Sequence, residues 1–171
     1  MIRCGAACAT FMVLLAACGC QPDVHSGANT AGSVAPSPAP HLVGMGLNGE
    51  HLDISTYPGH PVVIYFWASW CDPECTAEQP DLNGLAGRYP TVHFVGDDVR
   101  DNVANARAYV LDLKVPYPSV FDQLGVNIQS FHVVAIPATI VLNSTGEIVG
   151  RYLGTVSGIS QRLAALLSNG A

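Results

Sequence analysis

Basic side chains are scarce in this chain. Its 171 residues contain only seven Lys and Arg against 13 Asp and Glu, a net charge of −6 with the histidines neutral. A protein that binds nucleic acid needs a basic face to neutralise phosphates, so this balance argues against a nucleic-acid partner. Apolar residues make up 49% of the sequence. That content is ample for a hydrophobic core, and the length is typical of one domain.

The sequence also lacks an apolar run that is long enough to cross a bilayer comfortably. The N-terminal run over residues 6–17 follows Arg3 and is short, which is typical of an export signal peptide. It ends in Leu15-Ala-Ala-Cys18-Gly, which resembles the bacterial lipobox, in which the cysteine becomes the lipidated first residue. We expect a signal peptide over residues 1–17 and a lipid anchor on Cys18. An uncleaved anchor or an ordinary signal peptide is the alternative, and each predicts a domain outside the cytoplasm.

Residues 18–41 are rich in Gly, Ala, Ser and Pro. Such a segment has too few large apolar side chains to fold alone, so we expect a flexible tether that follows the lipidated cysteine. The predicted folded domain covers residues 42–171.

Cysteines are few in the predicted folded part. Of the six in the chain, Cys4, Cys8, Cys18 and Cys20 lie in the leader or beside the anchor, which leaves Cys71 and Cys75. Two close cysteines do not make a multi-bridge disulfide scaffold. In an exported protein this pair is more typical of a reactive disulfide.

The two cysteines lie in the string Trp67-Ala-Ser-Trp-Cys71-Asp-Pro-Glu-Cys75. The apolar run 62–67 predicts a buried strand, and residues 73–88 predict a helix. This places a cysteine at the positive end of a helix, which favours its thiolate and indicates thiol–disulfide exchange. The spacing is Cys-x-x-x-Cys, whereas redox motifs usually have Cys-x-x-Cys. Either Asp72 caps the helix with Pro73 at its first position, or the extra residue is absorbed as a bulge, and the pattern leaves both open.

The rest of the chain predicts a mixed α/β domain. A hairpin is expected over residues 42–52, a second central strand at 92–95, and a helix that Asp101 caps and that ends near residue 113. A strand at 119–121, a helix at 123–130, a hairpin of strands 138–142 and 148–152 and a last helix at 157–167 complete the pattern. Strands and helices that alternate before a final hairpin predict a mixed sheet with helices on both faces.

This order resembles the thioredoxin fold, and more narrowly the TlpA/ResA/CcmG branch of exported, membrane-tethered thiol–disulfide oxidoreductases. The resemblance spans residues 42–167, and its segments are Trp67-Ala-Ser-Trp-Cys71, Cys75-Thr-Ala-Glu78-Gln-Pro80-Asp-Leu82, Tyr117-Pro-Ser-Val-Phe-Asp122, Phe131-His-Val-Val-Ala-Ile136-Pro137-Ala-Thr139 and Asn143-Ser-Thr-Gly146-Glu147.

The resemblance implies roles for five of these residues. Cys71 would be the nucleophile and Cys75 the thiol that resolves the mixed disulfide. Pro137 would follow a cis peptide bond and, with Trp70 and Ile136, would shape the groove in which a partner strand docks.

The acid position and the partners also follow from the resemblance. Glu78 matches an acid of this branch, so it either relays protons or is an ordinary solvated helix glutamate. The buried aspartate of thioredoxin is absent, because Tyr65 stands at its place. Members commonly reduce apocytochrome c or other exported proteins and take electrons from a membrane thiol carrier. We expect protein thiols or disulfides as substrates, and neither a metal nor another cofactor.

Three other functions remain to be weighed. Sco-type copper proteins share the Cys-x-x-x-Cys spacing, and two thiolates with His132 would suit copper. Those proteins lack the preceding Trp and the Ile-Pro-Ala-Thr element, so copper delivery is the alternative function rather than the first. A thiol peroxidase of the peroxiredoxin type needs Thr or Ser where Ala68 stands. A binding module with a structural disulfide is the third.

Overall fold

The computed structural model describes residues 32–168. Its strands are β1 (Gly32–Pro38), β2 (Val43–Met45), β3 (His51–Asp53), β4 (Val62–Trp67), β5 (His93–Val99), β6 (Ser119–Asp122), β7 (Ala138–Leu142) and β8 (Glu147–Leu153). The helices are α1 (Glu74–Arg88), α2 (Val103–Asp112), α3 (Val126–Ser130) and α4 (Ile159–Ser168), with a short 3-10 turn, η1, at Ile54–Thr56. This is the mixed α/β thioredoxin-like fold that the sequence predicted.

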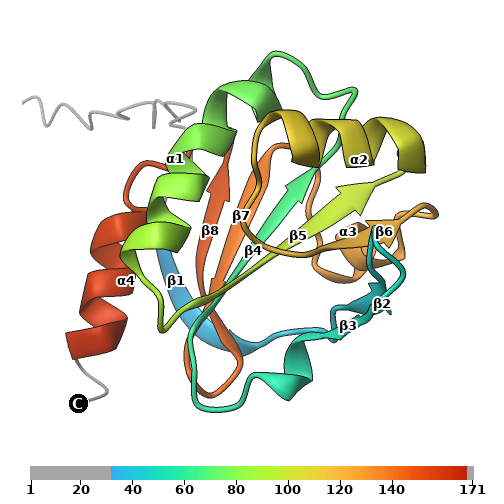
Figure 1. Cartoon of the computed structure of the whole chain (residues 1–171). Coiled ribbons are helices and arrows are strands. Elements are labelled where there is room, and N and C mark those ends of the chain that lie inside the picture. The colour runs from blue at the N-terminus through green and yellow to red at the C-terminus, as the bar shows by residue number, and fades with distance from the viewer. Residues whose placement is uncertain (1–31, 169–171) are drawn as a thin grey trace, which may run out of the picture.

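Six strands form one mixed sheet in the order β1-β8-β7-β4-β5-β6, and β2 and β3 form a separate hairpin. β4, β5 and β6 run parallel, whereas β7 is antiparallel to β4 and β8 is antiparallel to β7. The parallel strands need crossover connections, and α1 and α2 supply them. The carboxyl ends of β4 and β5 therefore lie at the same edge of the sheet (Figure 1), and the two cysteines follow β4 in the chain.

Apolar layers cover both faces of the sheet (Figure 1). One layer holds α1, α2 and α4, and its buried helix residues include Leu82, Leu85, Ala106, Tyr109, Ile159 and Leu163. The other lies under α3 and the β2–β3 hairpin and includes Leu42, Leu52, Ile128 and Phe131. All six residues of β4 are buried because side chains on both faces of this central strand meet such a layer. This explains why the sequence of β4 is an uninterrupted apolar run.

The ordered domain begins earlier than expected. β1 lies inside the segment expected to be a tether, and it pairs with the edge of β8 from Gly32 opposite Arg151 to Pro38 opposite Glu147. Pairing with a sheet edge uses backbone groups and needs no apolar side chains, and prolines are tolerated on an edge strand. The expectation of a tether is therefore wrong for residues 32–38. The expected signal peptide and the expected lipid anchor on Cys18 lie outside the described residues.

The start of α2 also differs from the expectation. Asn102, not Asp101, is the N-cap, because its side-chain oxygen accepts the backbone N–H groups of Ala104 and Asn105. Asp101 makes contacts outside this helix that are described below. On this helix Leu111 is exposed, whereas Tyr109 is buried. Between residues 32 and 168, no helix combines the length and the apolar character that crossing a membrane requires.

Candidate active site

Cys71 and Cys75 are joined by a disulfide at the beginning of α1. Their Cα atoms are 5.4 Å apart, within the usual range for a disulfide. The Cys75 backbone N–H donates to the Cys71 carbonyl at 2.8 Å, so one helical turn already links the two residues. The extra residue is thus accommodated inside this turn.

The helix start settles one alternative that the sequence left open. Pro73 occupies the N-cap position of α1, and no side chain caps the helix. Asp72 is exposed and precedes that position, so the reading of Asp72 as the cap is wrong.

The two sulfur-bearing residues differ in exposure. Cys71 is 7% exposed, whereas Cys75 is fully buried. Trp70, beside Cys71, is 59% exposed and its indole N–H donates to the Arg100 carbonyl at 3.3 Å. A partner can therefore reach Cys71 more readily than Cys75.

A second segment reaches the same end of the sheet. The Ile136–Pro137 peptide bond is cis, and Ala138, the next residue, pairs with Phe66 of β4. This register places Pro137 beside Trp67, the last residue of β4. Pro137 is buried and Ile136 is half-buried. The structure thus brings the predicted groove residues to the edge of the sheet that carries the cysteines.

Glu78 lies on α1, three residues after Cys75, and is half-buried. Burial, and then the nearby charge of Asp81, raises the pKa of the Glu78 carboxyl to about 7. One of its oxygens, Oε2, is buried and has no hydrogen-bond partner among the described residues. A carboxyl with this pKa is partly protonated at neutral pH, so it can both give and take a proton.

Tyr65 and Tyr109 are functional candidates that the sequence did not single out as such. The Tyr65 hydroxyl donates to the Cys75 carbonyl at 3.3 Å, so a tyrosine contacts the resolving segment at the place where thioredoxin has its aspartate. Tyr109 stacks on Trp67 with ring centroids 4.3 Å apart. Burial raises the pKa of both phenols, and the charge of Glu78 contributes in each case.

Acidic side chains at the ends of β5 and β6 were also missed. Asp97 and Asp98 are fully buried, and Asp101 and Asp122 are nearly so. The signal in the sequence was two adjacent acids inside an apolar strand, Phe94-Val-Gly-Asp-Asp-Val99. Burial raises the pKa of the Asp98 carboxyl to about 9, with the charge of Asp101 as the next cause.

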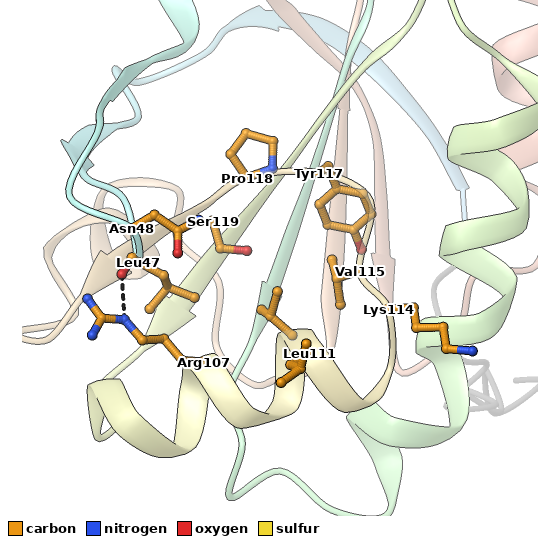
Figure 2. A pocket seen from close by; sticks show the side chains of 10 residues that line it. Leu47, Asn48, Arg107, Leu111, Lys114, Val115, Tyr117, Pro118 and Ser119 are labelled. Carbon is orange, nitrogen blue, oxygen red and sulfur yellow. Dashed lines mark hydrogen bonds between the residues drawn. The ribbon is translucent and has the colours of Figure 1, made fainter.

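A hollow of about 470 Å³ lies away from the cysteines, between α2 and the segment that leads into β6. Figure 2 shows Arg107 and Leu111 on the α2 side and Tyr117, Pro118 and Ser119 on the other, with the Arg107 Nε–H donating to the Leu47 carbonyl at 2.7 Å. Neither cysteine lines it. This hollow is therefore not part of the disulfide site.

The described residues contain no set of metal ligands that would support the copper alternative. His132 is exposed, and across residues 32–168 no three His, Cys, Asp or Glu side chains are grouped so that they would hold a metal. The two thiols that copper delivery would need are joined to each other instead.

Known proteins share both the sequence and the fold. Residues 36–151 match the AhpC/TSA family. The soluble secreted antigen MPT53 of Mycobacterium tuberculosis is 31% identical over 119 residues, which cover 70% of this chain and 68% of that protein. The thiol-disulfide oxidoreductase ResA of Bacillus cereus is 25% identical over 118 residues, 68% of each chain. The solved structure of Mycobacterium tuberculosis DsbF, in mixed oxidised and reduced forms, is similar with a TM-score of 0.68 and 28% identity, and the match covers 73% of this chain and 94% of that one.

These relatives include thiol–disulfide oxidoreductases, and they give the copper alternative no support. The disulfide at the start of α1, the cis-proline at the same edge and the extent of the family match lead to one assignment. The chain belongs to the AhpC/TSA family and is a thioredoxin-like thiol–disulfide oxidoreductase.

Proposed function

We propose that this protein is a lipid-anchored oxidoreductase outside the cytoplasm that exchanges its Cys71–Cys75 disulfide with partner proteins. The observation that carries the proposal is the disulfide itself, with a nearly buried but reachable Cys71 and a fully buried Cys75. A secreted relative supports the location.

The exchange follows from the difference in exposure. In the reducing direction the Cys71 thiolate attacks a sulfur of the partner disulfide, a Cys71–partner bond forms, and the other partner sulfur leaves as a thiolate. The Cys75 thiolate then attacks the Cys71 sulfur and releases the second partner thiolate. Two electrons pass to the partner, and the Cys71–Cys75 disulfide remains. The two protons that Cys71 and Cys75 lose on ionising are balanced by the two protons that the released partner thiolates take up. The oxidising direction is the reverse.

The helix start favours the first step. Cys71 lies two residues before Pro73, the N-cap of α1, where the positive end of the helix stabilises a thiolate. The Tyr65 hydroxyl and the first turn hold the backbone of Cys75. Cys71 therefore serves as the nucleophile and Cys75 as the resolving thiol.

The partner would dock against Trp70, Ile136 and Pro137. Trp70 offers an exposed aromatic surface, and the proline removes a backbone donor beside the thiols. Neighbouring backbone groups are then available to an extended partner strand. Apocytochrome c and other exported proteins are the substrates we propose, with a membrane thiol carrier as the source of electrons.

A glutathione redox titration tests the exchange. The purified protein is equilibrated at different ratios of oxidised and reduced glutathione, and Cys71 and Cys75 are read by alkylation and mass. We expect a reversible disulfide between them with a single midpoint. Thiols that fail to bridge over the whole range would exclude exchange chemistry.

Glu78→Gln tests the proton relay. Removing this carboxyl is expected to slow exchange by on the order of a hundredfold and to abolish a step near pH 7 in the pH–rate profile. The measurement is the rate of disulfide reduction between pH 5.5 and 9. Glu74→Gln is the matched control, because Glu74 is an exposed glutamate of the same helix. Equal profiles for the two variants would exclude a relay.

Cys18→Ala tests the anchor. We expect this variant to leave the membrane fraction and appear in the soluble fraction, with the disulfide unchanged, because the lipid is attached away from the folded domain. Cell fractionation and a blot provide the measurement, with Cys20→Ala as the control. Retention of the Cys18→Ala protein in the membrane fraction would contradict lipidation at this residue.

A further inference from the structure

The segment between β4 and Cys71 is held by contacts with a neighbouring turn. The backbone N–H of Ser69 donates to Asp101 Oδ2 at 2.5 Å, and the Ser69 hydroxyl donates to Asp101 Oδ1 at 2.9 Å. The Trp70 indole N–H donates to the carbonyl of Arg100, the residue before Asp101. Two consecutive residues that lead to Cys71 are thus tied to residues 100–101.

The topology places this turn where it can hold the cysteine segment. β5 runs parallel to β4, so the residues that follow β5 lie beside those that follow β4. Arg100 adopts a left-handed conformation with φ of 51°, and Asp101 also accepts its neighbour's N–H, from Asn102, at 2.6 Å. The Asp101 carboxylate therefore receives three donors, two of which come from Ser69.

A second carboxyl, that of Asp98, lies near Asp101. Asp98 is fully buried on β5, opposite Trp67 in the register, and neither of its oxygens has a donor among the described residues. The titratable groups that face it are Asp101, Asp97 and Asp122, all acidic. Burial, and then the charge of Asp101, raises the pKa of the Asp98 carboxyl to about 9.

We propose that Asp101 is a positioning residue for the exchange reaction and holds residues 68–71 so that Cys71 stays at the N-terminus of α1. The inference rests on the proposed role of Cys71 as the nucleophile. Asp101 acts through Ser69 and does not touch the reacting sulfur. Loss of its charge-assisted hydrogen bonds would free the segment, and small displacements of a reacting atom have large effects on rate.

Asp101→Asn is the decisive variant. An amide has one acceptor oxygen where the carboxylate has two, so it cannot accept both donors of Ser69 in the same way. We expect Cys71 alkylation in the reduced variant to follow a shifted pH profile and exchange to slow by tenfold or more. The emission of Trp70 in the oxidised variant should also change, with Trp70→Phe chains used to subtract the signal of Trp67.

Two comparison variants make the result specific. Asp53→Asn is the matched control, because the Asp53 carboxylate also accepts a backbone N–H, that of Ser55. Asp53 lies before the beginning of β4, whereas Cys71 follows the end of this strand. The Asp53→Asn variant should leave the alkylation profile and the rate unchanged. Ser69→Ala removes the hydroxyl that donates to Asp101 Oδ1 and keeps the backbone donor to Oδ2, so it should shift the alkylation profile in the direction of Asp101→Asn but by less.

The outcomes separate positioning from mere stability. A lower melting temperature for Asp101→Asn with an unchanged alkylation profile would overturn the proposal, and so would a Ser69→Ala variant with the wild-type profile. Failure of the proposed function would look different, because the wild-type thiols would then not bridge in glutathione. The alkylation profile and the Trp70 emission need no redox partner, so they report on positioning in either case.

Discussion

Cys75→Ser is expected to stop exchange at the mixed disulfide. With glutathione disulfide as the probe, Cys71 of this variant attacks and becomes joined to glutathione, and no second thiol is present to resolve the adduct. Turnover should fall on the order of a thousandfold or more, because an adjacent thiol reacts at an effective concentration that a thiol in solution cannot reach. Mass spectrometry of the intact protein and of its peptides measures the adduct.

Cys71→Ser is the matched variant for this experiment. Cys75 is fully buried, so its thiol should react slowly and little adduct should form. The peptide masses also separate these sites from Cys20, which lies outside the described residues. An adduct that forms readily on Cys75 and poorly on Cys71 would reverse the roles of nucleophile and resolving thiol.

Stability is expected to fall as the pH rises from 5 to 8. Asp97 and Asp98 are fully buried, and burial raises the pKa of both, that of Asp98 to about 9. In the unfolded chain these carboxyls ionise near pH 4. Between the two pKa values the folded state holds a proton that the unfolded state has lost. The free energy of unfolding therefore drops by about 1.4 kcal/mol per pH unit for each carboxyl that stays protonated, or on the order of 4 kcal/mol between pH 5 and 8 for Asp98 alone.

Urea unfolding of the oxidised protein at pH 5, 6.5 and 8 measures this dependence. Asp98→Asn should reduce the slope by about one proton, and Asp97→Asn should do the same while keeping an acceptor for the Asn127 amide. Asp53→Asn is the control. Hydrogen bonding with Ser55 lowers the pKa of the Asp53 carboxyl, which moves its titration further from this window. A stability that is constant or rises with pH would show that the buried carboxyls are ionised in the folded protein.

Local sequence was sufficient for the main elements and for the two cysteines. The apolar run of β4, the proline that follows and the helix pattern after it predicted a cysteine at a strand-to-helix junction, and the structure has this junction. The turn residues Asn143 to Gly146 likewise predicted the hairpin of β7 and β8. These predictions depend on neighbours in the chain, which is why a single sequence carries them.

Residues with several local solutions were harder to place. Asp101 and Asn102 are both good helix caps by type. In the structure the Asp101 carboxylate accepts hydrogen bonds from Ser69, which follows the neighbouring strand, and Asn102 caps α2. Glu78 looked equally like a solvated helix residue and a proton relay. Its raised pKa comes from desolvation, which the helix pattern does not reveal.

The sequence by itself determined the fold class, the place of the disulfide in a turn before a helix and the proline of the facing segment. Each depends on side-chain type and spacing along a few residues. Tertiary structure decided the pairing of β1 with β8, the contact of Tyr65 with the Cys75 carbonyl, and the burial of Asp97 and Asp98 on β5. The physical reason is that edge pairing, desolvation and side-chain hydrogen bonds arise between residues far apart in the chain, where no local pattern records which groups meet.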